Sequence, residues 1–316
     1  MYYDLVIQDA IGMPYNGSTV VGIGGSEFAI IKLAKLLGEQ NIKVLVRNNT
    51  EETVEIGNVR YENRYTAYQA ECKTLLLQRW TDLPFNVEFD RIAVWAHDIP
   101  GSQYNHFMAF FHRLDTRVIC LSKWQRSLYP VSWNSEIIDP LLPKLDFQLA
   151  KDKDQNSFIF PSAAIKGWDE TLKRWQIYKR VYSELLDAKL YVIDSGYDVA
   201  TKVNDSSVVY LPKLNDNQLW TIINRCAGLF YINTFNECYP VTCKMAEFAG
   251  TRTHILCLNG FGGIKDTLED HRFITDDQNE FIQVFLGVYG SNLRQTATKQ
   301  YSEEQIIKKW RTTLQI

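Results

Sequence analysis

Two charged residues, Lys166 and Glu237, occupy positions where chemistry on a phosphate or a sugar is expected. Lys166 precedes Gly167, and together they join an expected strand at 157–162 to the helix that follows. An ammonium at such a junction faces a ligand cleft and can offset phosphate charge, and glycine lets a ligand approach the backbone. Glu237 follows an expected strand at 228–233 and is also predicted to face a cleft. An ordinary exposed lysine is the alternative for Lys166.

The segment after Glu237 starts a helix, and the first turn of a helix offers unpaired backbone donors. Pro240 suits that turn, because the N–H that proline lacks would have no partner there. We therefore expect the N–H groups of Cys238, Tyr239 and Val241 to bind an anion or a hydroxyl group.

Glycine pairs lie at two further turns. Gly24 and Gly25 come at the start of the first expected helix, and Gly262 and Gly263 follow an expected strand at 254–259. Both turns are places where the backbone can contact a ligand, and a helix start also favours negative charge. A plain glycine-rich turn without a ligand is the alternative for Gly24 and Gly25.

His97 and Asp98 come directly after an expected strand at 91–96. Ligands of α/β proteins bind where parallel strands end. His97 can donate to a sugar hydroxyl or take part in proton transfer there. A histidine with a purely structural role is the alternative.

A dinucleotide-binding fingerprint is a competing interpretation of the first glycine-rich turn. Gly22 and Gly24 give its first two glycines, and Arg47 after the second strand would meet a 2′-phosphate. The fit is poor, because Glu27 takes the place of the third glycine and the preceding strand ends too early. No histidine or cysteine spacing is typical of a metal site.

Strands that are nearly continuous in apolar residues alternate with helical patterns, which predicts α/β domains with parallel sheets. A charged, proline-flanked stretch at 139–157 interrupts the alternation and indicates a linker. We therefore expect one domain over 1–146, a second over 147–300, and an amphipathic helix within 301–316 that has Ser302 as its N-cap. The expected strands are 3–8, 43–48, 74–79, 91–96 and 117–122, then 157–162, 189–194, 207–212, 228–233 and 254–259.

Composition narrows the class of protein. The chain has 316 residues and a net charge of −3, from 34 basic and 37 acidic residues, so no basic excess points to nucleic acid as a partner. Six cysteines without a CxxC pair predict buried free thiols. No signal peptide is evident at the start, and no run approaches the ~20 apolar residues that span a bilayer. We expect a cytoplasmic protein.

Peripheral contact with a membrane is a further possibility. Lys173, Arg174, Lys179 and Arg180 lie on an expected helix at 168–186, which would rest on anionic lipid through this basic face. We favour the alternative, in which the apolar stripe of the helix packs on the sheet and the basic face is solvated.

Taken in their order along the chain, the motifs resemble those of retaining glycosyltransferases of the GT-B fold, specifically the large family 4. The resemblance covers most of the chain. The matching segments are Gly-Gly-Ser-Glu (24–27), Trp-Ala-His-Asp (95–98), 120–130, Lys166-Gly167, 187–196, 207–232, Glu237 with Ala246 and Gly250, and the run from Gly262 to Asp266.

The resemblance implies two Rossmann-like, doubly wound domains that face each other across a cleft. The N-terminal domain would take the acceptor, a glycan or lipid-linked glycan, and the C-terminal domain the nucleotide-sugar donor. The helix in 301–316 would cross back onto the N-terminal domain. No metal and no cofactor is implied, because the nucleotide-sugar is itself a substrate.

The resemblance also implies roles for individual residues. Gly24 and Gly25 would approach the donor diphosphate, and Lys166 would stabilise phosphate charge as the sugar leaves. Glu237 would lie beside the transferred sugar with the amides of 238–241. His97 would lie near the anomeric carbon, and Asp98 on the acceptor side. The acceptor hydroxyl would attack from the face that the diphosphate leaves, so that configuration is retained.

The sequence departs from the family at two donor-binding positions. Met245 stands where the second acid of the E-x7-E motif normally holds the ribose, and Glu247 is about 200° further round a helix. Ser162 and Ala163 lie in the region where the family has an arginine. These departures leave open a non-catalytic relative that binds a nucleotide-sugar or glycan. A virus-type, DNA-modifying glucosyltransferase is another alternative, which the charge of −3 disfavours.

Overall fold

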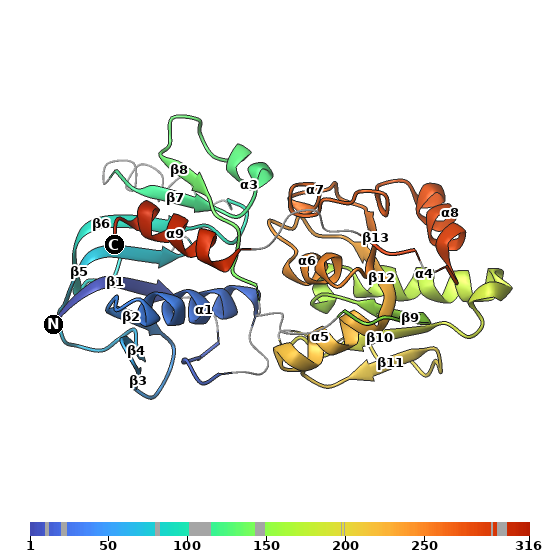
Figure 1. Cartoon of the computed structure of the whole chain (residues 1–316), viewed down its shortest axis with the longest axis horizontal. Helices are drawn as coiled ribbons and strands as arrows, with labels where there is room; N and C mark the ends of the chain where they lie inside the picture. Colours follow the sequence, from blue (N-terminus) through green and yellow to red (C-terminus); the bar gives the residue numbers. More distant parts are fainter. Residues whose placement is uncertain are drawn as a thin grey trace. The chain divides into compact units, whose positions relative to one another are not determined.

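The computed structural model of the chain is described for residues 1–9, 13–19, 24–79, 83–100, 115–142, 149–196, 198, 200–291, 293–295 and 302–316. The chain divides into two compact units. The first comprises residues 1–19, 25–141 and 301–316, and the second comprises the rest (Figure 1). The boundary predicted at 146/147 lies outside the described residues.

The first unit is built on an eight-stranded sheet with the order β3-β4-β2-β1-β5-β6-β7-β8. All neighbouring strands are parallel except β3 and β4, which form an antiparallel pair at one edge. Its strands are β1 (Tyr2–Asp9), β2 (Val44–Asn48), β3 (Val54–Ile56), β4 (Val59–Asn63), β5 (Ala70–Gln78), β6 (Val87–Trp95), β7 (Arg117–Cys120) and β8 (Ser135–Ile137).

The last helix of the chain, α9 (Glu303–Leu314), packs on the first unit beside α1 (Gly25–Glu39) (Figure 1). Its Trp310 is fully buried and meets Trp95 of β6 edge-on, with ring centroids 4.5 Å apart. The hydroxyl of Thr74 in β5 donates to the carbonyl of Leu314 at 2.8 Å. Ser302 caps the helix by accepting the N–H of Gln305, as expected.

The second unit has a six-stranded sheet that is parallel throughout, with the order β11-β10-β9-β12-β13-β14. Its strands are β9 (Asp154–Phe160), β10 (Lys189–Ile193), β11 (Val208–Leu211), β12 (Cys226–Asn233), β13 (Arg252–Cys257) and β14 (Ile274–Thr275). Its helices are α4 (Trp168–Val181), α5 (Asp216–Arg225), α6 (Val241–Phe248), α7 (Ile264–Thr267) and α8 (Gln278–Val288), with short 3-10 turns η1 (Ala164–Lys166) and η2 (Ser183–Leu185).

Aromatic rings fill the core of the second unit. Phe230 of β12 contacts Trp175 and Tyr178 of α4 and Phe281 and Phe285 of α8, so these two helices cover one face of the sheet. Helices α5 and α6 contact each other on the other face (Figure 1). The prediction of an α/β chain with two parallel-sheet, Rossmann-like domains is confirmed.

Three further predictions concern the strands, the cysteines and membrane-spanning helices. All ten predicted strands are present, but β3, β4, β8 and β14 were not predicted; each has only two to five residues. All six cysteines are free and buried, as predicted. In the described part of the chain, no helix combines the length and the apolar composition needed to cross a membrane.

Arg47 and the helix at 168–186 differ from expectation. Arg47 is buried and donates to the Glu62 carboxylate at 2.8 Å, so it is not placed for a 2′-phosphate. Arg174 is also mostly buried, and it pairs with Glu170. Lys179 donates to backbone carbonyls. The basic face of α4 is therefore only partly solvated, because two of its cations are used within the unit.

Trp310 tests how far α9 stabilises the first unit. Trp310→Ala removes a fully buried ring and should lower the free energy of unfolding by about 3–5 kcal/mol. Lys308→Ala, on the exposed side of the same helix, should change it by less than about 0.5 kcal/mol. Denaturant unfolding measures both, and equal effects would contradict the packing role of α9.

Candidate functional site

Lys166 and Glu237 form an ion pair in the second unit. The Lys166 Nζ donates to the Glu237 Oε2 at 2.9 Å, and the Tyr231 hydroxyl lies 3.3 Å from the other carboxylate oxygen. The Glu237 side chain is 8% exposed and that of Lys166 is 30% exposed, so only the ammonium side of the pair is open to solvent. Each residue was predicted from the sequence, but their contact was not.

The backbone before α4 approaches the end of β12 so closely that only glycine fits at residue 167. Gly167 has φ +130°, and a Cβ there would lie 1.9 Å from the carbonyl oxygen of Ile232. The N–H of Thr234 donates to the carbonyl of Lys166 at 3.1 Å. The Lys166 turn is thus attached to the strand end that leads to Glu237, which explains why the two side chains meet.

Asp198 holds the same turn from the other side. Its carboxylate accepts the N–H of Ala164 at 2.9 Å and the N–H of Ile165, the two residues before Lys166. It also accepts the Ser195 hydroxyl at 2.9 Å. Asp198 was not predicted from the sequence. An acidic residue in the loop after β10 was the available signal, but the two N–H groups that it accepts lie 34 and 33 residues away, and no local pattern identifies them.

Ser162 and Tyr231 lie next to the ion pair. Burial raises the pKa of Tyr231 well above its usual range, the nearby charge of Glu237 raises it further, and a hydrogen bond with Ser162 acts in the opposite direction. The Tyr231 hydroxyl is also 3.0 Å from the Oδ1 of Asn233. A neutral phenol therefore helps to hold the carboxylate of Glu237 in place.

The backbone donors after Glu237 differ in part from expectation. The N–H of Val241 donates to the carbonyl of Tyr239 at 3.0 Å, and Pro240 between them has the dihedral angles of an inverse γ-turn. The expectation of an available donor at Val241 is therefore wrong, because the turn already uses that N–H. Cys238 is buried and Tyr239 partly exposed, and α6 begins at Val241, after Pro240.

Residue 245 lies in the core of the second unit. Met245 is 1% exposed and belongs to its hydrophobic cluster. The nearby Glu247 accepts Lys244 Nζ at 2.6 Å and the N–H of Glu269 at 2.7 Å. Position 245 therefore offers no carboxylate to a ligand, and Glu247 is used to hold the loop that contains Glu269.

The second glycine-rich turn contacts Glu237 through its backbone. Gly262 has φ +52°, and a Cβ there would lie 2.8 Å from the Glu237 carbonyl oxygen. The N–H of Gly263 donates to the same oxygen at 2.6 Å. These glycines let two loops pack tightly around Glu237, and their contact with a ligand stays a prediction.

The first unit has its own polar cluster where β5 and β6 end. The Nε of Arg79, a residue with φ +64°, lies 3.2 Å from the Oδ2 of Asp98. The buried Gln125 of α3 (Lys123–Ser127) donates to the carbonyls of Ala96 and Asp98 at 3.0 and 3.1 Å. These contacts hold the turn that bears His97.

His97 is half-buried and packs on Trp95, with ring centroids 4.6 Å apart. Burial lowers the pKa of His97 to about 3, and the charge of Arg79 lowers it further. The imidazole is therefore neutral near pH 7, which suits it to hydrogen bonding with a hydroxyl group. Of the glycines before α1, Gly24 is buried and Gly25 is the exposed first residue of the helix, whereas Gly22 lies outside the described residues.

Comparisons with solved structures identify the architecture. The sequence matches no family model and no curated protein. The structure resembles WaaG, a glycosyltransferase involved in lipopolysaccharide biosynthesis, with a TM-score of 0.53 and 12% identity over 99% of this chain and 90% of that one. It resembles the trehalose-6-phosphate synthase OtsA with a TM-score of 0.61 and 12% identity, over 98% and 94% of the two chains. It also resembles the Anabaena protein Alr3699/HepE, in complex with UDP-glucose, with a TM-score of 0.57 and 12% identity over 89% of this chain and 88% of that one.

These likenesses show that the chain has the GT-B fold, in which two Rossmann-like domains are joined in one chain. The fold part of the resemblance is thereby confirmed.

Gly167→Ala tests the close approach at the Lys166 turn. The substitution should lower the free energy of unfolding by more than Gly260→Ala, a change at another positive φ (+89°) with nothing within 4 Å of the added Cβ. Backbone strain alone accounts for about 1–3 kcal/mol in the control, whereas Gly167→Ala also forces the backbone away from Ile232. Equal losses in denaturant unfolding would contradict the constraint.

Proposed function

We propose that this chain is a glycosyltransferase that moves a sugar from a nucleotide-sugar donor to an acceptor hydroxyl with retention of configuration. The observation that carries the proposal is the Lys166–Glu237 pair at the carboxyl end of the sheet in the second unit of a GT-B fold. Ligands of open α/β sheets bind at this end. The alternative of an unpaired, merely exposed lysine is disfavoured, because Lys166 has a buried carboxylate partner.

Lys166 is proposed to bind the donor diphosphate. In the structure its charge is balanced by Glu237, whose other oxygen contacts Tyr231. A diphosphate carries more negative charge than one carboxylate, so it can compete for the ammonium while Tyr231 keeps Glu237 in position. As the bond to the sugar breaks, negative charge grows on the leaving diphosphate, and a fixed cation stabilises it. Gly25 and the backbone of Cys238 and Tyr239 are proposed as further donor contacts.

Glu237 is proposed to lie beside the transferred sugar, where it accepts sugar hydroxyls and stabilises the positive charge of an oxocarbenium-like transition state. The acceptor oxygen attacks the anomeric carbon from the face that the diphosphate leaves, and the hydroxyl proton passes to the departing diphosphate oxygen. Neither step requires a covalent nucleophile or a metal ion, because placement and fixed charge supply the catalysis.

His97 and Asp98 are proposed to act on the acceptor side. The imidazole is neutral near pH 7 because its pKa is about 3, so it would bind a hydroxyl by hydrogen bonding and not act as a general acid. The Arg79–Asp98 pair adds a donor and an acceptor next to it. A glycan or lipid-linked glycan is the proposed acceptor, reached in the cytoplasm or at the surface of a membrane; the fold relative WaaG takes part in lipopolysaccharide biosynthesis.

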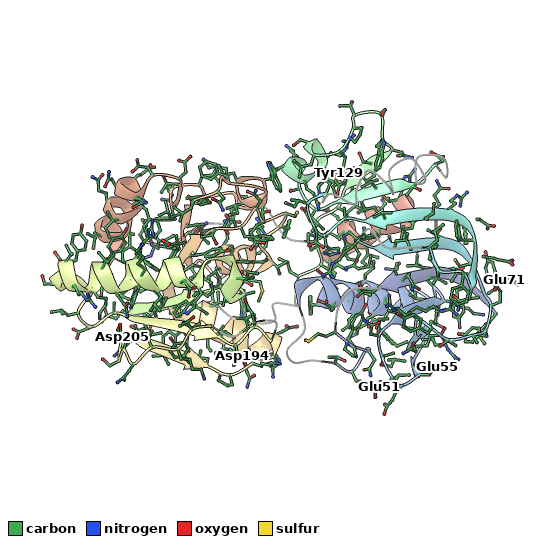
Figure 2. All side chains as sticks on the ribbon, turned by 180° about the vertical axis from the view of Figure 1, so that it is seen from behind. Glu51, Glu55, Glu71, Tyr129, Asp194 and Asp205 are labelled. Carbon is green, nitrogen blue, oxygen red and sulfur yellow. The ribbon has the colours of Figure 1, made fainter. Side chains whose placement is uncertain are left out.

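A non-catalytic relative that binds a nucleotide-sugar or glycan is the second candidate. Met245 favours it, because its buried side chain leaves the expected ribose position without a carboxylate. A DNA-modifying glucosyltransferase is less well supported. Exposed carboxylates lie on both units, among them Glu51, Glu55, Glu71 and Asp194 (Figure 2), and duplex binding favours a basic surface.

Lys166 and Glu237 should respond differently to substitution. Lys166→Ala should weaken donor binding and lower turnover about 10²–10³-fold, as for other single groups that stabilise transition-state charge. Glu237→Gln should lower turnover but leave nucleoside-diphosphate affinity equal or higher, because it removes the carboxylate that competes for Lys166. Sugar-transfer kinetics and calorimetric titration with the nucleoside diphosphate measure the two effects.

Lys173→Ala is the matched control, because this exposed lysine of α4 lies outside the proposed site. Circular dichroism verifies that each variant is folded. Unchanged kinetics in Lys166→Ala would remove it from the phosphate site. A loss of nucleotide affinity in Glu237→Gln that equals its loss of turnover would refute the competition between carboxylate and diphosphate.

A further inference from the structure

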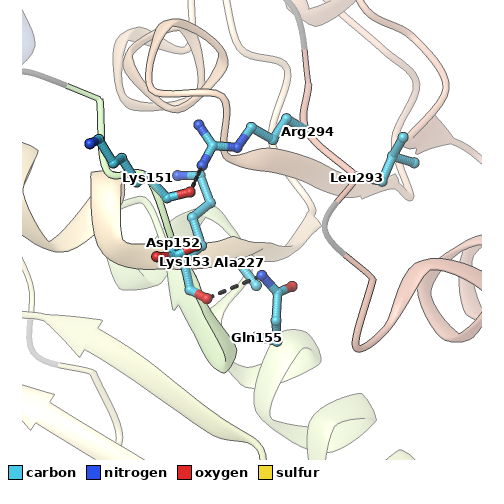
Figure 3. Close-up of a pocket in the computed structure, with 7 residues that line it drawn as sticks. All are labelled: Lys151, Asp152, Lys153, Gln155, Ala227, Leu293 and Arg294. Atoms are coloured by element: carbon cyan, nitrogen blue, oxygen red, sulfur yellow. Dashed lines mark hydrogen bonds between the residues drawn. The ribbon is translucent and has the colours of Figure 1, made fainter.

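The second unit has a cavity at the amino end of its sheet, the opposite end of β9 from Lys166. Its volume is about 130 Å³, which exceeds the roughly 30 Å³ that one water molecule occupies in the liquid. The cavity is lined by Lys151, Asp152, Lys153, Gln155, Ala227, Leu293 and Arg294 (Figure 3). Most of this lining is polar or charged, and all of it belongs to one unit.

Lys153 is buried at the wall of this cavity. Its side chain donates to the carbonyl of Asn224 at 2.8 Å and to the hydroxyl of Thr251 at 2.7 Å. Burial lowers the pKa of Lys153 to about 8, and the charges of Arg294 and Arg252 add to this lowering. Among the described residues, the ammonium is therefore held in place by neutral acceptors.

Two arginines increase the positive charge around Lys153. Arg252 is fully buried and donates to the carbonyls of Ala227 and Val288. Arg294 is partly exposed and donates to the carbonyls of Ala150 and Lys151 (Figure 3). Burial also lowers the pKa of Arg252, to about 10.

Within the ranges that the structure describes, the acceptors of all three cations are neutral oxygens. Asn224 and Val288 lie at the C-terminal ends of α5 and α8, so their carbonyls carry part of a helix dipole. A helix end supplies about half an elementary charge, which does not neutralise a buried cation. Asp152 is the one carboxylate among the described residues that line the cavity, and it is exposed to solvent.

We propose that this cavity is a second ligand site that binds a phosphate group, as inorganic phosphate or as the phosphate monoester of a small molecule. A dianion would satisfy the excess charge of Lys153 and Arg294, and the exposed Lys151 would supply a further donor at the rim. An arginine and a lysine that converge on one cavity suit the tetrahedral oxygens of phosphate better than a single carboxylate. The site does not depend on the proposed transferase activity.

Phosphate titration of the intact protein tests the proposal. The melting temperature is measured with increasing inorganic phosphate against sodium chloride of equal ionic strength, because salt alone screens charge. The measurement uses the Lys166→Ala background, so that the donor site does not contribute. A phosphate-dependent rise in Tm is expected in this background, because a ligand that binds only the folded state stabilises it.

Arg294→Gln and Lys151→Gln, introduced separately, should abolish or strongly reduce this rise, and Lys173→Gln should not change it. The two substituted side chains are at least partly exposed, so both variants are expected to fold. The proposal is overturned if the phosphate-dependent rise in Tm persists unchanged in both variants. It is also overturned if the rise occurs in the wild-type protein and is absent from Lys166→Ala.

Vesicles distinguish a lipid headgroup from a soluble phosphate. Flotation is measured with phosphatidylcholine vesicles that contain phosphatidic acid. Binding that depends on Arg294, without a response to inorganic phosphate, would assign the same chemistry to a lipid headgroup. The proposal fails if neither phosphate nor these vesicles give an Arg294-dependent effect.

Discussion

At residue 167 the chain passes so close to the end of β12 that a Cβ would lie 1.9 Å from the carbonyl oxygen of Ile232. This contact places Lys166 at the strand end from which Glu237 extends, and Asp198 holds the turn from the opposite side. Gly262 and Gly263 then pack against the backbone of Glu237. The position of both charged side chains thus follows from backbone contacts that side chains larger than hydrogen would prevent.

Cations at the two ends of the sheet in the second unit have different kinds of hydrogen-bond partner. At the carboxyl end, Lys166 has a buried carboxylate partner, Glu237. At the amino end, the hydrogen-bond acceptors of Lys153 and Arg252 in the described part of the chain are neutral oxygens, and burial lowers the pKa of each. Cations without carboxylate partners are costly to bury. We infer that each end is suited to an anion: a diphosphate that competes with Glu237, and a phosphate that supplies the missing charge.

Much of the fold was predictable from the sequence, because long apolar strands such as 228–233 are recognisable without their neighbours. The importance of Lys166, Gly167 and Glu237 was predictable from their places after strands. Their contact was not, because it depends on how two loops about 70 residues apart pack together. Asp198 and the cavity beside Lys153 were not predicted for the same reason, because each is formed by residues that are distant in sequence. The prediction of an available donor at Val241 was wrong, because its N–H already donates within a local turn.

Donor binding, measured together with turnover, tests whether this chain is a glycosyltransferase. The thermal stability of the protein is measured with UDP-, GDP-, ADP- and TDP-sugars, and release of the nucleotide is recorded in the same samples. We expect that one base raises Tm by several degrees, because a ligand at 100 times its Kd adds about 2.7 kcal/mol, and that this nucleotide is then slowly released. A rise without release, even with glycan acceptors present, would favour the non-catalytic relative. If no donor raised Tm, the proposed donor site would be refuted, and the chain would have the GT-B fold without the proposed function.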